Sequence, residues 1–200
     1  MDNRIELSVI VPCFNLEPFI GDLLMSISQQ KLADDNVEYI FVLDSCTDNT
    51  RNIIEEYGVA DQIIECSVHS CGLARNIGLE ASHGEYIWFM DGDDWLIDDY
   101  AIASVIEFVK GKDMIKIPFL SDKYNCKCYA MVWQYCFNRE LIGDIRFRAQ
   151  QPAEDNDFMD KIFEKRASKN MEEFARALYF YRYLRQGSNM YRFKILQEDI

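Results

Sequence analysis

The sequence predicts an α/β fold with a mostly parallel central sheet flanked by helices. Apolar runs of strand length at residues 8–12, 39–43 and 63–64 alternate with segments whose apolar residues recur at helical spacing. A fourth apolar run, at residues 86–90, ends abruptly in a group of acids. Strands that alternate with helices pair in parallel, because each helix returns the chain to the same end of the sheet.

Helix signals lie between these strands. Pro18 suits the first turn of a helix, and Leu23 and Ile27 follow at helical spacing. Residues 47–50 are typical of a helix start and Gly58 of a helix end. Residues 72–79 then have the pattern of a third helix. Three strand–helix alternations therefore precede the acids.

The second half continues the pattern less regularly. A helix is expected up to residue 112, a strand at 114–119, and a long apolar and aromatic run at 130–137 that leads into another helix. Apolar residues in the segment 171–178 have helical spacing. The tyrosines of residues 179–183 are expected to lie in a packed strand.

The acids Asp91, Asp93 and Asp94 stand at the carboxyl end of the run 86–90. Carboxylates crowded at this place repel one another, and a divalent cation would cancel their charge. Gly92 lets the backbone turn sharply and leaves space for a ligand. A solvated acidic turn is the alternative. The position at the mouth of an open α/β sheet, where such sheets bind ligands, favours the metal site.

Four segments together carry a family resemblance. In order and spacing they resemble the signature of glycosyltransferase family 2, namely residues 11–17 (Val-Pro-Cys-Phe-Asn-Leu-Glu), 43–50 (Leu-Asp-Ser-Cys-Thr-Asp-Asn-Thr), 72–78 (Gly-Leu-Ala-Arg-Asn-Ile-Gly) and 91–94 (Asp-Gly-Asp-Asp). The resemblance is strong over residues 6–100 and weaker to residue 190. It implies the GT-A fold, which is Rossmann-like, and inverting, metal-dependent sugar transfer.

The resemblance implies a nucleotide-sugar site on the first half of the chain. The turn under the base and ribose would be formed by Pro12, Phe14, Asn15 and Glu17. Asp44 matches the carboxylate that accepts a hydrogen bond from the uracil N–H. Arg75 matches an arginine near the base and diphosphate, where its five-donor fork suits the charge. The departures are Leu43, where the family usually has an acid, and Ser45 and Cys46, where it commonly has Gly and Ser. These departures weaken the expectation that the bound nucleotide base is uracil.

The same resemblance implies the metal and the catalytic base. Asp91 would contact the ribose, with Gly92 beside it, Asp93 would bind Mg²⁺ or Mn²⁺, and Asp94 would support the site. Asp155, in the pair Glu154-Asp155 that opens a helix, would be the general base that activates the acceptor hydroxyl. Arg182 or Arg185 would neutralise the diphosphate after transfer.

Structural alternatives remain for the three main assignments. Asp44 also suits an Asx turn or helix cap. Arg75 also suits a surface salt bridge. Acids at a helix N-terminus, such as Glu154 and Asp155, complement the helix dipole without any catalytic role.

Length and composition limit the domain organisation and the classes of function that remain possible. A chain of 200 residues with 49% hydrophobic content suits one domain, with a nucleotide-binding half at about residues 1–97 and an acceptor-side half at about 98–200. Because the family often has a longer C-terminal portion, the resemblance implies either a short member or a chain truncated at its C-terminus. The net charge of −13 argues against nucleic-acid binding. With no signal peptide or membrane span, a cytoplasmic protein is expected, and peripheral membrane contact and the oligomeric state stay open. The seven cysteines lack a zinc pattern.

The leading function is transfer of a sugar from a nucleotide sugar, UDP-linked, to a hydroxyl of a glycan or a lipid-linked sugar in cell-surface polysaccharide synthesis. One alternative is a nucleotide- or glycan-binding module without turnover. A sugar-nucleotide nucleotidyltransferase is disfavoured, because residues 12–15 lack the glycine-rich phosphate loop of that class. The donor sugar and the acceptor are not specified by the sequence.

Overall fold

The computed structural model describes residues 4–32, 36–123, 131–149, 154–165 and 171–183. Its main sheet has seven strands in the order β3-β2-β1-β4-β8-β6-β9. In that order they are β3 (Gln62–Cys66), β2 (Val37–Asp44), β1 (Leu7–Cys13), β4 (Tyr86–Phe89), β8 (Tyr135–Asn138), β6 (Met114–Lys116) and β9 (Met171–Glu173). The first four are parallel, and β8 runs antiparallel to β4 and β6. The predicted mostly parallel α/β fold is confirmed.

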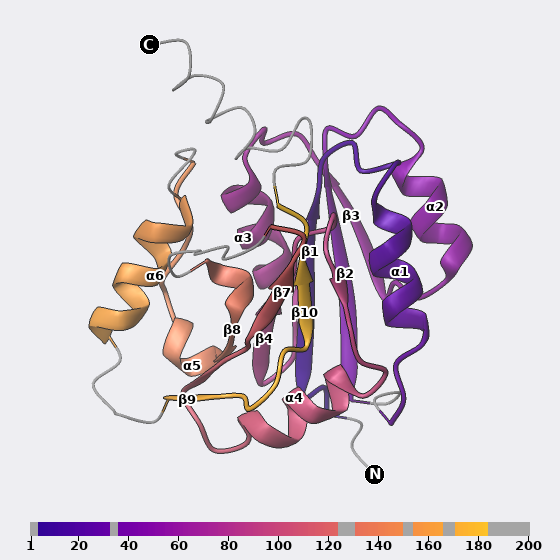
Figure 1. The fold of residues 1–200 in the computed structure, drawn as a ribbon. Helices are drawn as coiled ribbons and strands as arrows, with labels where there is room; N and C mark the ends of the chain where they lie inside the picture. Colours follow the sequence, from indigo (N-terminus) through magenta and orange to yellow (C-terminus); the bar gives the residue numbers. More distant parts are fainter. Residues whose placement is uncertain (1–3, 33–35, 124–130, 150–153, 166–170, 184–200) are drawn as a thin grey trace.

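Helices cover both faces of this sheet. They are α1 (Ile20–Ser28), α2 (Thr50–Tyr57), α3 (Cys71–Ala81), α4 (Ala101–Val109), α5 (Arg139–Ile142) and α6 (Glu154–Lys165), with a 3₁₀ turn, η1, at Val132–Gln134. In Figure 1, α1 and α2 lie at the right of the sheet, and α5 and α6 lie at the left. Alternation along β1 explains the two layers, because Val9 packs in the core with Leu23 of α1, whereas Ile10 packs with Phe158 of α6.

A second, small sheet brings the end of the described chain back to the middle. It has the order β5-β10-β7, formed by β5 (Trp95–Leu96), β10 (Tyr179–Tyr181) and β7 (Phe119–Ser121). Tyr179 pairs with Leu96 on one side and with Phe119 on the other. This arrangement places β10 beside the acidic turn that follows β4, and Figure 1 shows β10 crossing in front of the main sheet.

The helical prediction for residues 171–178 is wrong. Residues Met171–Glu173 form β9 at the edge of the main sheet, and Ala175 is exposed. The N–H of Phe174 donates to the carbonyl of Lys116 at 2.8 Å, and that of Leu178 to the carbonyl of Pro118 at 3.2 Å. The backbone groups that a helix would have paired internally are therefore satisfied by the neighbouring chain.

The single strand predicted at residues 114–119 is also wrong, because it is divided between the two sheets. β6 ends at Lys116, and β7 begins at Phe119. Pro118 lies between them and has no N–H to donate to a ladder, so the chain leaves the main sheet there. Among the described residues, no helix is long and apolar enough to cross a membrane.

Candidate functional site

The acidic turn is the centre of the site. It follows β4 at the carboxyl edge of the sheet, and the N–H of Asp94 donates to the carbonyl of Asp91 at 3.2 Å. Carboxylate oxygens of Asp91, Asp93 and Asp94 lie within 4.8 Å of one another. These are the hard donors that Mg²⁺ and Mn²⁺ take, so the donor set fits such an ion.

At Gly92 the acidic turn lies close to side chains of the first strand–helix unit. A Cβ at this position would lie 2.5 Å from Cδ1 of Leu16 and 3.2 Å from Cδ1 of Ile20. The missing side chain therefore makes room for the loop after β1 and for α1, and the approach of a ligand to Gly92 stays a prediction. Gly92 packs the acidic turn tightly onto the first strand–helix unit.

Asp94 is the most enclosed of the three acids. It is fully buried, and its Oδ2 accepts a hydrogen bond from the hydroxyl of Tyr179 at 2.8 Å. Its Oδ1 accepts a bond from the backbone N–H of Arg182, also at 2.8 Å. Burial, together with the charges of Asp93 and Asp91, raises the pKa of Asp94 well above its ordinary value. A cation at the turn would relieve this repulsion.

Arg75 joins the acidic turn to the start of α6. Its NH2 group donates to Oδ1 of Asp91 at 2.8 Å, and its NH1 group donates to Oδ1 of Asp155 at 2.7 Å. NH1 also lies 3.6 Å from Oε1 of Glu154. The side chain is only 3% exposed, so Arg75 is a buried link and not a surface pair. Burial alone would lower the pKa of Arg75, but the surrounding negative charges, with Asp155 first, raise it above its ordinary value.

Asp155 is held from two sides. In addition to Arg75, the backbone N–H of Val132 donates to its Oδ2 at 3.2 Å. Burial raises the pKa of Asp155, and the charge of Arg75 opposes that rise. The carboxylate is thus oriented and more basic than a surface aspartate, as a general base requires.

Helix α3 reaches this network because its first turn packs against the segment before α6. A Cβ on Gly72 would lie 2.9 Å from the carbonyl oxygen of Arg148 and 3.2 Å from Cγ of Glu154. The amide of Asn76 also exchanges hydrogen bonds with the backbone of Phe147, at 2.9 and 3.0 Å. Segments some 75 residues apart in the sequence are thereby fixed together.

Asp44 has a structural role at the end of β2. Its carboxylate accepts hydrogen bonds from the backbone N–H groups of Val68, His69 and Ser70, at 2.8 to 3.0 Å. Ser45 and His69 both have left-handed backbone conformations, with φ of 57° and 51°. Asp44 therefore holds the loop before α3, a structural role that differs from the local Asx turn or helix cap expected as the alternative. Its role in base recognition stays a prediction.

The loop after β1 is bound to the loop after β2. Oδ1 of Asn15 accepts the N–H of Thr47 at 2.8 Å, and Oε2 of Glu17 accepts the N–H of Asn49 at 3.0 Å. Pro12 lies within β1, and Phe14 is 48% exposed. These contacts give Asn15 and Glu17 a structural role, and they leave the ring of Phe14 open to solvent beside the carboxyl edge.

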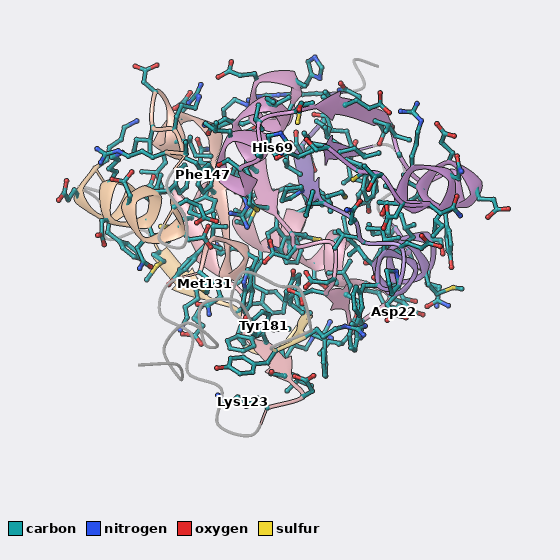
Figure 2. All side chains as sticks on the ribbon, turned by 90° about the horizontal axis from the view of Figure 1, so that it is seen from above. Asp22, His69, Lys123, Met131, Phe147 and Tyr181 are labelled. Atoms are coloured by element: carbon teal, nitrogen blue, oxygen red, sulfur yellow. The ribbon has the colours of Figure 1, made fainter. Side chains whose placement is uncertain are left out.

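Figure 2 views this edge from above. His69 and Phe147 lie on one side of the centre, and Met131, Tyr181 and Asp22 lie on the other. Loops and strands from both halves of the chain thus frame one face.

A family comparison agrees with the resemblance found in the sequence. Glycosyl transferase family 2 matches residues 8–171, most of the chain. The chain belongs to glycosyltransferase family 2.

Among its relatives in this family is the glycosyltransferase GlyA of Streptococcus pneumoniae, which is 27% identical over 92% of the chain and 31% of GlyA. Poly(ribitol-phosphate) beta-N-acetylglucosaminyltransferase TarS of Staphylococcus aureus is 34% identical over 46% of the chain and 17% of TarS. The chain therefore spans less than a third of these relatives.

Solved structures show the same fold. The structure of S. aureus TarS 1-349 in complex with UDP-GlcNAc superposes with a TM-score of 0.83, at 23% identity, over 94% of this chain and 61% of that one. Mannosyltransferase PcManGT from Pyrobaculum calidifontis, in complex with GDP-Man and Mn²⁺, superposes with a TM-score of 0.74, at 18% identity, over 97% of this chain and 61% of that one. The GT-A fold of family 2 is confirmed.

Within this family fold, Arg182 is already engaged. Its Nε donates to the carbonyl of Asp93 at 3.0 Å, and its NH2 group is ion-paired with Asp22. Its guanidinium lies 4.9 Å from the ring centre of Trp95 and 5.3 Å from that of Phe19. Arg182 therefore lies at the acidic turn, and its role toward a diphosphate stays a prediction. Arg185 lies outside the described residues.

Sequence reasoning assigned the tyrosines of β10 to the core and missed what one hydroxyl reaches. Tyr179 is buried as expected, but its hydroxyl contacts the acidic turn. Asp22, the partner of Arg182, was also missed. The available signal was that a tyrosine in a buried strand needs a hydrogen-bond partner for its hydroxyl.

Proposed function

We propose that this chain is an inverting, metal-dependent glycosyltransferase that moves a sugar from a UDP-sugar to an acceptor hydroxyl. The observation that carries the proposal is the link made by Arg75. It joins Asp91, in the acidic turn, to Asp155, the candidate base, through bonds of 2.8 and 2.7 Å. A nucleotide-binding module without turnover needs the acidic turn but has no need of an oriented, buried carboxylate at the start of α6.

The donor half would bind the nucleotide sugar with its diphosphate at the acidic turn. A bound Mg²⁺ or Mn²⁺, held by Asp93 with a contribution from Asp91, would stabilise the leaving diphosphate as a Lewis acid. The exposed ring of Phe14 and the carboxylate of Asp44 would contact the base. Arg182, directly after β10, supports the turn by donating to the carbonyl of Asp93.

The acceptor half would supply the base. Asp155 would accept the proton of the acceptor hydroxyl as that oxygen attacks the anomeric carbon from the face opposite the diphosphate, which inverts the configuration. Burial favours proton uptake, while Arg75 keeps the group ionised before the reaction. Arg75 and the N–H of Val132 hold the two oxygens in one orientation, which a positioned base needs.

The relatives support a donor and an acceptor class. The similar TarS structure contains UDP-GlcNAc, and another similar structure, of glucosyl-3-phosphoglycerate synthase, contains UDP and Mn²⁺. TarS itself is named for transfer to poly(ribitol phosphate). We therefore propose a UDP-sugar donor and a glycan or lipid-linked acceptor of the cell surface.

Calorimetry tests the metal and nucleotide part of the proposal. UDP is titrated into the wild type and into Asp93→Ala, in Mn²⁺ and in chelator, with Glu107→Ala on the far helix α4 as the matched control. The wild type and the control should bind UDP more tightly in Mn²⁺, and Asp93→Ala should lose that gain. Equal wild-type affinity in Mn²⁺ and in chelator would exclude the metal site.

A panel of nucleotide sugars then separates an enzyme from a binding module. Metal-dependent release of UDP from one of them, with a product of inverted anomeric configuration, is expected of the transferase. Tight binding without release from any donor, with acceptor glycans present, would support the module instead. Retained configuration would contradict single displacement.

A further inference from the structure

Strand β10 brings one hydroxyl group to the acidic turn. The hydroxyl of Tyr179 donates a hydrogen bond to Oδ2 of Asp94 at 2.8 Å and accepts one from the backbone N–H of Asp91 at 3.0 Å. It therefore bridges the first and last residues of the turn Asp91–Asp94, from a strand about 85 residues later in the sequence. Through these two bonds the tyrosine can fix the shape of the turn without itself being a metal ligand.

The ring cannot move away from this position. Tyr179 is fully buried, and its ring stacks on Trp133 with centres 5.0 Å apart and planes 16° apart. The ring of Trp88 lies 6.1 Å away on β4. Because the ring is packed on two buried tryptophans, the direction of its hydroxyl is set by the core, and the turn must adapt to it.

Both carboxylate oxygens of Asp94 accept hydrogen bonds from the segment that includes β10. Its second oxygen accepts the N–H of Arg182, the residue that follows β10, so both of its oxygens are bonded to this one segment of the chain. The orientation of Asp94 determines how near its charge lies to Asp93, and the bond to the N–H of Asp91 determines where the turn begins. The spacing of the carboxylates available to an ion thus depends on the tyrosine hydroxyl.

We propose that Tyr179 is a positioning residue of the metal site: its hydroxyl sets the geometry of the turn Asp91–Asp94 and so the affinity for the divalent cation. The inference rests on the proposed metal-dependent nucleotide binding. Groups that orient the ligands of an ion contribute roughly 10- to 100-fold to metal affinity. Tyr179 belongs to this class because its hydroxyl touches two residues of the turn while its side chain is fully buried.

The test is Tyr179→Phe, which keeps the ring stack and removes only the hydroxyl. Mn²⁺ is titrated in the presence of saturating UDP, with free Mn²⁺ followed by electron paramagnetic resonance. The apparent dissociation constant for Mn²⁺ should rise about 10- to 100-fold. UDP affinity in chelator should change less than about twofold, and high Mn²⁺ should restore wild-type UDP affinity, which a general loss of structure would not allow.

Tyr181→Phe is the matched control. Tyr181 lies on the same strand, is buried, and stacks on the same Trp133 with centres 4.8 Å apart. Its variant should bind Mn²⁺ within about twofold of the wild type. A comparable loss in both variants would show that the effect comes from the packing of β10 and would overturn the proposal.

The wild type separates this inference from the proposed function. If wild-type UDP binding ignores Mn²⁺, the proposed metal site fails and this inference fails with it. If the wild type requires Mn²⁺ and Tyr179→Phe binds it equally well, the positioning role alone is wrong. Should Tyr179→Phe not fold, Asp94→Ala removes the acceptor of the same hydrogen bond from the turn, and unchanged Mn²⁺ affinity in that variant would equally refute the proposal.

Discussion

Replacing Arg75 by methionine tests the central link of the site. The substitution removes a buried charge that hydrogen-bonds Asp155 and Asp91 and leaves a side chain of similar length. Asp155 is then buried without its charged partner. Asp91 is less affected, because its side chain is 25% exposed and water can screen it.

The expected loss follows from these contacts. Breaking a buried ion pair by removing one partner costs about 3–5 kcal/mol. For a chain of this size each kcal/mol lowers the Tm by about 2–4 °C, so Arg75→Met should lower the Tm by about 6–20 °C. Arg75→Lys keeps the charge but cannot fork to both carboxylates. It should lose about one charged hydrogen bond, worth roughly 1.5–3 kcal/mol.

The loss of stability in Arg75→Met should also depend on pH in a predictable direction. The pKa of Asp155 is already raised by burial, and it rises further when Arg75 is lost. A carboxyl whose folded pKa lies above its unfolded value costs stability at higher pH, and that cost disappears as the pH falls below the unfolded value. The Tm difference between the wild type and Arg75→Met should therefore be largest near pH 7 and shrink toward pH 4.

Thermal unfolding followed by circular dichroism measures these changes. Arg51→Met is the matched control, because Arg51 pairs with Glu55 and Glu65 on the surface and such pairs contribute only about 0–1 kcal/mol. A Tm for Arg75→Met no lower than that of the control would refute the buried link between the turn and α6.

Three other substitutions address the base, the nucleotide and the opposite edge of the sheet. Asp155→Asn should slow sugar transfer by roughly 10²–10⁴ with nearly unchanged UDP affinity, and normal turnover in a folded variant would move the search to Glu154 or Asp157. Asp44→Ala should weaken UDP more than GDP in competition binding, whereas equal losses would leave Asp44 a purely structural role. Burial alone would raise the pKa of Glu38, but hydrogen bonds from Ser8 and His83 hold it below its ordinary value. Glu38→Gln should therefore lower the Tm at pH 7, with the difference vanishing as the pH falls through that depressed pKa, and a difference independent of pH would contradict this.

The sequence by itself determined the parallel half of the sheet and the place of the acids. The segments that form β1, β2 and β4 are apolar on both faces of the strand. A strand of that kind must be covered by helices on each side of the sheet. Asp44 and Asp91 directly follow such runs, so their position at the carboxyl edge needed no knowledge of the tertiary structure. The order of four motifs carried the family assignment in the same way.

Only the tertiary structure decided what the later part of the chain does. Residues 171–178 have helical spacing, yet open sheet edges beside Lys116 and Pro118 pair with their backbone, and local periodicity does not reveal such distant partners. The same holds for the contacts of Arg75 with Asp155 and of Tyr179 with Asp94, which join positions 80 and 85 residues apart. Each depends on how close two packed elements come, which is set by side-chain volume in the core and cannot be derived from the residue types at either end.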